Sequence, residues 1–230
     1  MNFHVITIFP NLFDSYLGDS MMRRAIESGA IKVQFYNPRD YTQNKHNKVD
    51  DIPYGGGPGM IMTVDPIMRA WESARYKGSQ NKFMRLLTTG RIDNGKKYKT
   101  IILSPGGTEF TTQYAKSTAQ NYTDIIFICG RYEGVDARVK EIIDNEAEEV
   151  SIGNYVLTGG ELPTMVIIDS ISRQIDGVLG NKLSLEEERI SSHAMYTRPA
   201  EYIHNKKTYT VPQVLMDGNH ALIDQWRKNN

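Results

Sequence analysis

The sequence predicts an α/β protein with a mostly parallel sheet that is covered by helices on both faces. Short apolar segments alternate with segments of helical periodicity along residues 1–175, which is the pattern of repeated strand and helix units. Glycine-bearing turns close several of the strand-like segments, as is typical where a strand leaves such a sheet. With 40% of its 230 residues hydrophobic, the chain can bury the core that this fold requires.

The N-terminal elements follow from apolar periodicity and from the residues that interrupt it. Residues 5–9 are mostly β-branched or aromatic and predict a buried strand, which Pro10 ends. Asn11 is suited to cap the helix that follows, in which apolar residues recur at intervals of three and four. Residues 31–36 predict the second strand, and Asp65-Pro66 predicts the start of the next helix.

The central elements continue the same alternation. Strands are predicted at residues 101–103, 125–128 and 149–152, and helices at residues 112–120, 135–143 and 163–175. Beyond Gly180 the chain becomes polar and has no sustained strand pattern. We therefore expect an α/β domain at residues 1–180, a mobile interdomain linker at 181–200 and a small helical C-terminal domain at 201–230, with its clearest helix at 219–228.

Composition excludes several classes of protein. The longest apolar runs, such as residues 125–129, are much shorter than the roughly 20 residues that span a bilayer, so we expect no membrane association. The single cysteine, Cys129, excludes an internal disulfide and a cysteine-based zinc cluster. The first residues have no basic segment before an apolar run, which predicts a cytoplasmic protein without a secretory signal.

The charge distribution is compatible with a nucleic-acid partner but does not require one. The 27 basic and 27 acidic residues cancel, whereas nucleic-acid-binding proteins usually carry a basic excess. The segment from Arg75 to Lys99 is rich in Lys and Arg and contains one acid, Asp93. A solvated loop and a contact to an RNA backbone both remain open for this segment.

The glycines suggest a shared pocket at one end of the sheet. Ligands of parallel α/β sheets bind outside the carboxyl ends of the strands, and glycine allows a ligand to approach the backbone closely. The predicted strand ends carry Gly106-Gly107, Gly130, Gly153 and Gly159-Gly160. Ordinary turns explain any one of these glycines, but three consecutive strand ends of this kind favour one pocket.

A second glycine-rich segment, residues 55–59, resembles neither of the common phosphate-binding loops. It is not followed by Lys-Ser or Lys-Thr, and it does not open a helix directly after a strand. A constrained glycine loop near Asp50 and Asp51 suits a flat, hydrogen-bonding ligand such as a nucleic-acid base. A purely structural loop explains the same residues equally well.

Other reactive residues give no reaction by themselves. The five histidines lack the close spacing of metal ligands, so no metal site is predicted. Ser104 lacks the glycine-flanked turn of a nucleophilic serine. Arg173 falls in an apolar helix, where an ion pair at the edge of the core is the simplest reading.

The ordered motifs closely resemble the bacterial tRNA (guanine-N(1)-)-methyltransferase family, within the trefoil-knotted class of RNA methyltransferases. The resemblance covers nearly the whole chain. It rests on Phe9-Pro10 with Phe13, PRDY (residues 38–41), VDDIPYGGGPGM (49–60), LSPGG (103–107), CGRYEGVD (129–136), SIGNYVLTGGELP (151–163), GVLG (177–180), YTRP (196–199) and residues 211–215.

The resemblance implies a deep trefoil knot and a homodimer whose active site is shared between the subunits. It also implies that S-adenosylmethionine binds in the knot, at the glycine-bearing strand ends. The donor contacts implied in this sequence are Leu103, Pro105, Gly130, Tyr132, Glu133, Ile152, Gly153, Tyr155, Leu157, Gly159 and Gly160. Members of the family are similar in using magnesium ion.

The substrate that the resemblance implies is the guanine at position 37 of tRNA, methylated at its N(1) nitrogen. Arg173 matches the arginine that stabilises negative charge on the base, and Asp50, Gly55 and Gly59 would border the bound base. Counted from Gly180, Glu188 stands where the family has the aspartate that acts as general base, and Glu187 is the alternative in the adjacent register. The C-terminal domain is expected to contact tRNA. Two alternatives stay open: a related knotted ribose 2′-O-methyltransferase, and an RNA-binding module without turnover.

Overall fold

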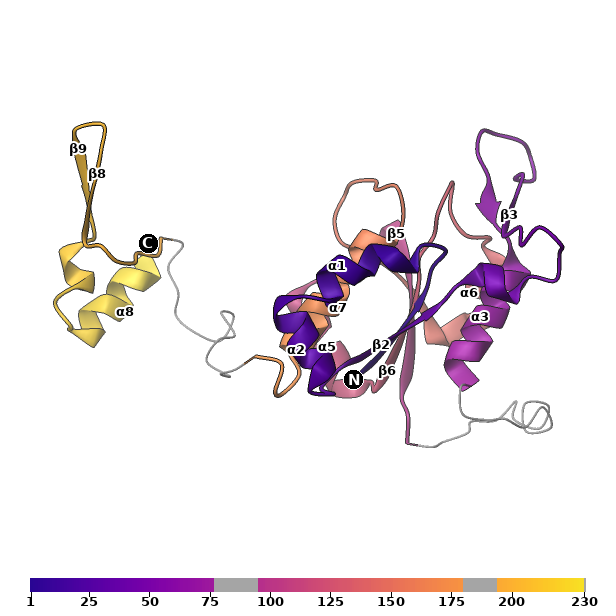
Figure 1. The fold of residues 1–230 in the computed structure, drawn as a ribbon, viewed down its shortest axis with the longest axis horizontal. Coiled ribbons are helices and arrows are strands. Elements are labelled where there is room, and N and C mark those ends of the chain that lie inside the picture. Colours follow the sequence, from indigo (N-terminus) through magenta and orange to yellow (C-terminus); the bar gives the residue numbers. More distant parts are fainter. Residues whose placement is uncertain (77–94, 180–193, 230) are drawn as a thin grey trace. The chain divides into compact units, whose positions relative to one another are not determined.

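The computed structural model describes residues 1–76, 95–179 and 194–229. The chain divides into two compact units, Met1–Leu179 and Gly180–Asn230 (Figure 1).

A five-stranded parallel sheet forms the centre of the larger unit, which confirms the predicted α/β class. Its strands lie in the order β2-β1-β6-β5-β7. Their bounds are Asn2–Ile6 for β1, Lys32–Tyr36 for β2, Tyr98–Glu109 for β5, Asp124–Ile128 for β6 and Ala147–Ser151 for β7. Ile6 pairs with Tyr36 on one side and with Ile128 on the other, so the carboxyl ends of these strands align.

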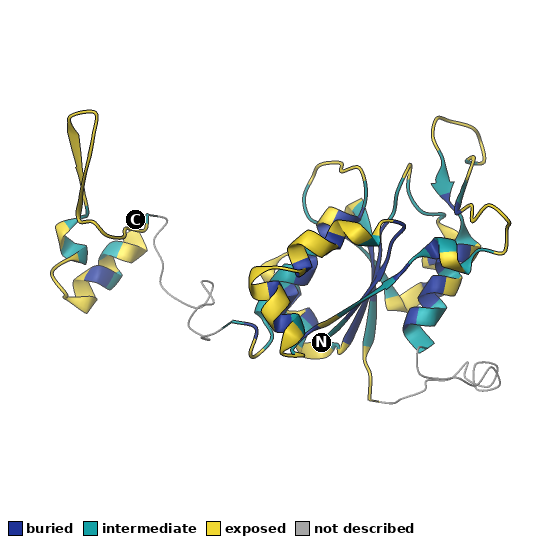
Figure 2. Ribbon diagram, viewed as in Figure 1, coloured by how far each residue is buried: buried dark blue, intermediate teal, exposed yellow. Residues whose placement is uncertain are grey.

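Helices cover both faces of this sheet (Figure 1). One face carries α1 (Asp14–Leu17), α2 (Ser20–Glu27), α5 (Thr112–Asn121) and α7 (Glu161–Arg173), whereas the other carries α3 (Val64–Tyr76) and α6 (Arg138–Ile143). Strand β6 shows why helices must cover both faces of the sheet. Ile125 and Phe127 belong to the core on one side, Ile126 and Ile128 to the core on the other, and all four are fully buried (Figure 2). An uninterrupted apolar run is the expected sequence for such a central strand.

Short elements complete the larger unit. They are the 3-10 turns Pro10–Phe13 (η1), Pro38–Tyr41 (η2) and Asp144–Glu146 (η3), and the two-residue strands Asp50–Asp51 (β3) and Ile61–Met62 (β4), which pair antiparallel. The ring of Phe13 packs 5.1 Å from that of Phe35 in β2, and this contact holds η1 on the sheet.

Two predicted N-terminal elements differ from the structure. The first strand ends at Ile6 rather than Phe9, because the Thr7 side chain turns toward Glu161 and Phe9 is 42% exposed. The single helix expected after Asn11 is two helices, because α1 ends at Gly18 and Asp19 caps α2 by accepting a hydrogen bond from the Ser20 amide.

The predicted end of the third long strand was also wrong. Strand β5 continues past Leu103 to Glu109, and its pairing with β7 shifts register between Leu103 and Thr108. Residues 104–107 therefore bulge out of the strand instead of closing it. The helix expected from residue 135 begins only at Arg138.

The smaller unit contains the predicted C-terminal helix, α8 (His220–Asn229), after a short turn, η6 (Gln213–Leu215). It also contains a hairpin that was not predicted, formed by β8 (Glu201–His204) and β9 (Lys207–Thr210). Asn205 and Lys206 connect the strands with positive φ angles of 48° and 65°, as a two-residue hairpin turn requires.

No helix among the described residues has the length and apolar character needed to cross a membrane.

Candidate functional site

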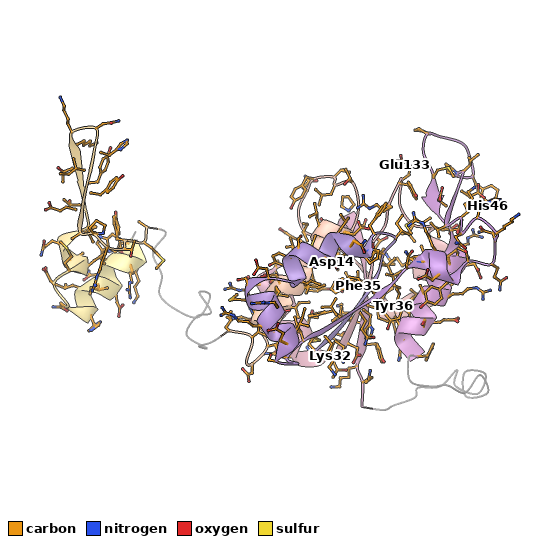
Figure 3. The ribbon with its side chains drawn as sticks, in the orientation of Figure 1. Asp14, Lys32, Phe35, Tyr36, His46 and Glu133 are labelled. Carbon is orange, nitrogen blue, oxygen red and sulfur yellow. The ribbon has the colours of Figure 1, made fainter. Side chains whose placement is uncertain are left out.

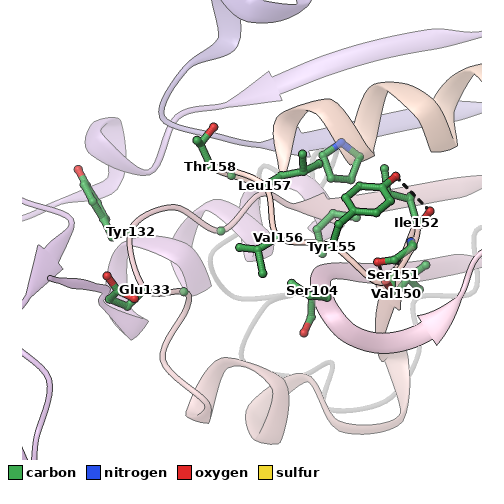
Figure 4. Close-up of a pocket in the computed structure, with 18 residues that line it drawn as sticks. Ser104, Tyr132, Glu133, Val150, Ser151, Ile152, Tyr155, Val156, Leu157 and Thr158 are labelled. Carbon is green, nitrogen blue, oxygen red and sulfur yellow. Dashed lines mark hydrogen bonds between the residues drawn. The ribbon is translucent and has the colours of Figure 1, made fainter. Parts of the chain in front are cut away.

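A cavity of about 230 Å³ opens beside the bulge of β5 and at the carboxyl ends of β6 and β7 (Figure 4). The described residues that line it come from three segments, each of which follows or interrupts one of these strands. They are Leu103, Ser104, Pro105, Gly130, Tyr132, Glu133, Gly134, Val150, Ser151, Ile152, Gly153, Tyr155, Val156, Leu157, Thr158, Gly159, Gly160 and Pro163.

All eleven residues expected to contact a methyl donor lie in this lining. They are Leu103, Pro105, Gly130, Tyr132, Glu133, Ile152, Gly153, Tyr155, Leu157, Gly159 and Gly160. The cavity also uses side chains that the sequence did not single out, such as Val156, Thr158 and Pro163. Val156 and Thr158 lie between predicted contacts in one continuous loop, which was the available signal, whereas Pro163 lies in the first turn of α7.

The bulge of β5 forms one wall of the cavity. Ser104 and Pro105 line it, whereas Gly106 and Gly107 are not among the described lining residues. A Cβ at Gly107 would lie 2.5 Å from the backbone nitrogen of Val150, so glycine there lets the bulge return onto β7. Gly107 thus shapes the wall without facing the cavity.

The segment after β6 forms a second wall and connects it to the glycine loop. The Glu133 amide donates to the carbonyl of Met60 at 3.0 Å, and the Met62 amide donates to the carbonyl of Gly134 at 3.0 Å. A Cβ at Gly59 would lie 2.5 Å from Glu133 Oε1. The structure therefore brings the glycine loop, predicted to border a base, against the cavity wall. Glu133 lies at the end of the sheet where the strands finish, whereas Lys32, at the start of β2, lies at the other end (Figure 3).

The loop after β7 forms the third wall. The Ser151 hydroxyl accepts a hydrogen bond from the Gly153 amide at 3.2 Å and donates to the Gly153 carbonyl at 2.9 Å. The Tyr155 hydroxyl donates to the carbonyl of Ile152 (Figure 4). Where the loop meets α7, the Gly160 amide donates to the carbonyl of Gly130 at 2.9 Å, which joins the second and third walls.

The chemistry of the lining suits binding better than covalent catalysis. Burial raises the pKa of the Cys129 thiol, and nearby Glu161 adds to this effect, so the thiol stays protonated. The walls present backbone and mostly apolar or aromatic side chains, with hydroxyls from Ser104, Ser151 and Thr158 and the carboxylate of Glu133. Such a site favours a ligand that has both a flat ring and a positive charge.

The residues expected to bind or deprotonate the guanine do not all lie in this cavity. Asp50 lies in β3, paired with Met62 in β4, and lines a separate polar depression with Thr42, Gln43, Asn44, Lys48, Asp51, Thr63, Asp65 and Pro66. Gly55 and Gly59 have φ angles of 85° and 82°, which explains glycine at both positions. Glu188 and Glu187 lie outside the described residues.

The structure does not bring Arg173 to the cavity of its own chain. Arg173 is the last residue of α7, whereas Gly160, at the start of that helix, lines the cavity. At 1.5 Å per residue, Arg173 lies about 18 Å along the helix axis from Glu161. Arg173 and the cavity thus lie at opposite ends of α7.

A metal site finds no support in the described parts of the chain. Within residues 1–76, 95–179 and 194–229, no three His, Cys, Asp or Glu side chains converge in a way that could hold a metal ion. His4 is a satisfied core residue, with Nε2 3.0 Å from Asp124 Oδ1 and Nδ1 3.1 Å from the Tyr36 hydroxyl. The described residues therefore offer no such cluster for the magnesium ion that the resemblance implies.

Comparison with known proteins places these features in a family. The family described as tRNA (Guanine-1)-methyltransferase TrmD matches residues 1–230. A tRNA (guanine-N(1)-)-methyltransferase of Clostridioides difficile is 44% identical over 99% of this chain and 91% of its own length. Proteins of the same name from Alkaliphilus oremlandii and Carboxydothermus hydrogenoformans are 43% and 42% identical, over 98% and 99% of this chain and 85% and 81% of their own lengths.

Proposed function

This chain belongs to the tRNA (guanine-1)-methyltransferase family, and we propose that it transfers the methyl group of S-adenosylmethionine to N(1) of guanine 37 in tRNA. Methyl transfer to the N(1) nitrogen of guanine in tRNA is its activity. The methyl donor and the position in tRNA are the proposed parts. The observation that carries the proposal is the cavity beside the β5 bulge and at the ends of β6 and β7, whose lining contains every expected donor contact.

Two features of the lining support an adenosyl sulfonium donor. The lining presents backbone at Gly153, Gly159 and Gly160, and Leu157 and Ile152 offer apolar contact to a flat ring. The Glu133 carboxylate complements a positively charged ligand. When bound, S-adenosylmethionine supplies a methyl group activated by its sulfonium charge.

The acceptor requires a base and a cation. Guanine N(1) carries a proton at neutral pH, so we assign Glu188, or Glu187 in the alternative register, to remove it. We assign Arg173 to stabilise the negative charge that develops on the exocyclic oxygen of the base. Asp50, Gly55 and Gly59 would border the base, and the closeness of Gly59 to Glu133 supports this for Gly59. Holding donor and acceptor in line supplies much of the rate.

A homodimer with a shared active site resolves the distance between Arg173 and the cavity. The outer side of α7 exposes Leu162 and Val166, which are 57% and 49% exposed. The helix α1 lies next to α7 (Figure 1). The segments η1 and α1 expose Leu12 and Tyr16, and Tyr16 donates a hydrogen bond to Asp169. If two α7 helices pack antiparallel through this apolar face, Arg173 of one chain approaches the cavity of the other.

Replacing Val166 with aspartate is expected to give a monomer without methyl transfer, because it buries a charge in the proposed interface. Sedimentation velocity gives the mass, and an assay on tRNA gives the activity. Ile142→Asp is the matched control, since Ile142 is 58% exposed on α6, on the other face of the sheet. A wild-type monomer with full activity would exclude the shared site.

The position in tRNA is tested with altered substrate. We expect methyl transfer to a tRNA with guanine at position 37 and none when that guanine is replaced by adenine, because the proton-removal step requires N(1)–H. Mass spectrometry of the nucleosides identifies the product. Equal activity on both tRNAs would refute the site, and a 2′-O-methylated ribose would favour the alternative transferase.

We assign residues 1–180 to donor binding, 181–200 to an interdomain linker and 201–230 to tRNA contact. We also assign the protein to the cytoplasm, where tRNA is found. The β8–β9 hairpin supports the tRNA contact with exposed aromatic and basic side chains, including Lys207 5.1 Å from the Tyr209 ring. Comparing tRNA binding of wild type and Lys207→Ala tests the assignment. The knot implied by the resemblance stays a prediction.

A further inference from the structure

We propose that Arg131 is a positioning residue, which holds the loop at residues 157–160 and the start of α7 in the arrangement that the methyl donor requires. The inference rests on the proposed function, because it concerns the loop that forms the third wall of the cavity. Arg131 acts from behind this wall: Gly130 and Tyr132 are among the described residues that line the cavity, and Arg131 is not.

The Arg131 side chain contacts two other segments of the chain. Its Nε lies 2.8 Å from Glu161 Oε2 at the start of α7, in an ion pair. Its Nη1 donates to the carbonyl of Thr158 at 3.2 Å. The guanidinium carbon lies 4.7 Å from the centre of the Phe9 ring, in a cation–π contact. One side chain thus connects the segment after β6, the loop after β7 and the segment after β1.

Loss of Arg131 is expected to destabilise the protein, because its partner Glu161 is buried. It is 1% exposed, and its other oxygen accepts a hydrogen bond from the Thr7 hydroxyl at 2.8 Å. A buried carboxylate needs an opposite charge, so loss of Arg131 leaves Glu161 without its ion-pair partner. The start of α7 is then expected to shift or to admit water, and the adjoining loop moves with it.

The glycine next to this contact shows how closely the loop backbone rests on the guanidinium. A Cβ at Gly159 would lie 2.4 Å from Arg131 Nε and 2.7 Å from its Cζ. Gly159 and the next residue, Gly160, both line the cavity. A displacement of Arg131 is therefore transmitted directly to backbone that faces the donor.

The contacts with Glu161 and Thr158 need the planar guanidinium of Arg131, not only its positive charge. A lysine at this position therefore distinguishes a positioning role from a purely electrostatic one. Arginine presents several N–H groups in a fixed fork and can serve Glu161 and Thr158 at once, whereas lysine is a single point charge. Arg131→Lys keeps a positive charge near Glu161 and is expected to keep most of the thermal stability. It is not expected to keep the loop in place.

The test measures donor affinity, steady-state kinetics and melting temperature for Arg131→Lys and Arg131→Gln. We expect both variants to raise the dissociation constant and KM for S-adenosylmethionine by about 10- to 100-fold, because a binding group shifts when the residue that supports it is lost. We expect Arg131→Gln to melt well below wild type and Arg131→Lys close to it. Affinity for tRNA should be unchanged in both.

Lys140→Gln is the matched control, because it removes an exposed ion pair with Glu149 (3.0 Å) on the same unit. It is expected to change neither donor affinity nor KM, since exposed pairs contribute little. Glu161→Gln should reproduce the donor defect of Arg131→Gln, and the double variant should be no worse than either single variant.

The outcomes separate this proposal from the proposed function. Wild-type protein that binds no S-adenosylmethionine would contradict the proposed function itself. Wild-type protein that binds it, with Arg131→Lys binding equally well, would overturn only the positioning role. Donor affinity that falls in Arg131→Lys at an almost unchanged melting temperature supports that role.

Discussion

Replacing Gly160 with alanine is expected to weaken S-adenosylmethionine binding by at least about 100-fold, because it separates two walls of the cavity. The added Cβ would lie 2.7 Å from the Cα of Cys129 and 3.1 Å from the nitrogen of Gly130. Both atoms are backbone, so no side chain can rotate away to relieve the clash. The hydrogen bond from the Gly160 amide to the Gly130 carbonyl, 2.9 Å long, must lengthen or break. Calorimetric titration gives the dissociation constant.

Gly106→Ala is the matched control for this substitution. A Cβ at Gly106 meets no atom of the described residues within 4 Å, and Gly106 is not among the described residues that line the cavity. The same change of residue type should therefore leave donor affinity near the wild-type value. Circular dichroism establishes that both variants are folded. If Gly160→Ala is folded and binds the donor normally, the two walls do not need to meet at this point.

Replacing Glu188 with glutamine is expected to lower kcat by about 10²- to 10⁴-fold, the usual contribution of a general base. Glutamine keeps the length and hydrogen-bonding capacity of glutamate but cannot accept the proton of guanine N(1). Binding of tRNA and of the donor should stay close to wild type, because neither depends on proton transfer. Single-turnover methylation with both substrates saturating isolates the chemical step.

Glu187→Gln is the matched control, because it makes the same chemical change one position earlier. It should leave the rate nearly unchanged, and the opposite result would assign the base to Glu187. Arg173→Ala should resemble Glu188→Gln, with a loss in kcat that exceeds the loss in tRNA affinity. An unchanged rate in both glutamine variants would remove these carboxylates from the mechanism.

The fold was predictable where local pattern and burial agree. The apolar run of β6 is buried on both faces, so its hydrophobicity alone was enough to predict a central strand. The glycines at positions 130, 153, 159 and 160 were predictable as cavity residues, because parallel strands place their carboxyl ends together.

The differences arise where tertiary contacts override local pattern. Thr7 leaves the first strand because its hydroxyl meets Glu161, which lies more than a hundred positions away in the chain. The bulge of β5 depends on the space between Gly107 and β7, which no local signal in LSPGG reveals. The contacts of Arg131 with Phe9, Thr158 and Glu161 join three distant segments in the same way.

The hairpin of the C-terminal unit was missed for a different reason. Asn-Lys is a weaker turn signal than Asn-Gly, although both residues adopt positive φ angles here. The four residues of each strand are all exposed, so no alternation between a buried and an exposed face marks them in the sequence.

Calorimetric titration of the unsubstituted protein with S-adenosylmethionine tests the central claim most directly, namely that the glycine-lined cavity beside the β5 bulge and at the ends of β6 and β7 holds the methyl donor. We predict saturable binding, with the signal lost in Gly160→Ala and retained in Gly106→Ala. Folded wild-type protein that takes up no S-adenosylmethionine, or that binds it equally well after Gly160→Ala, would contradict the account.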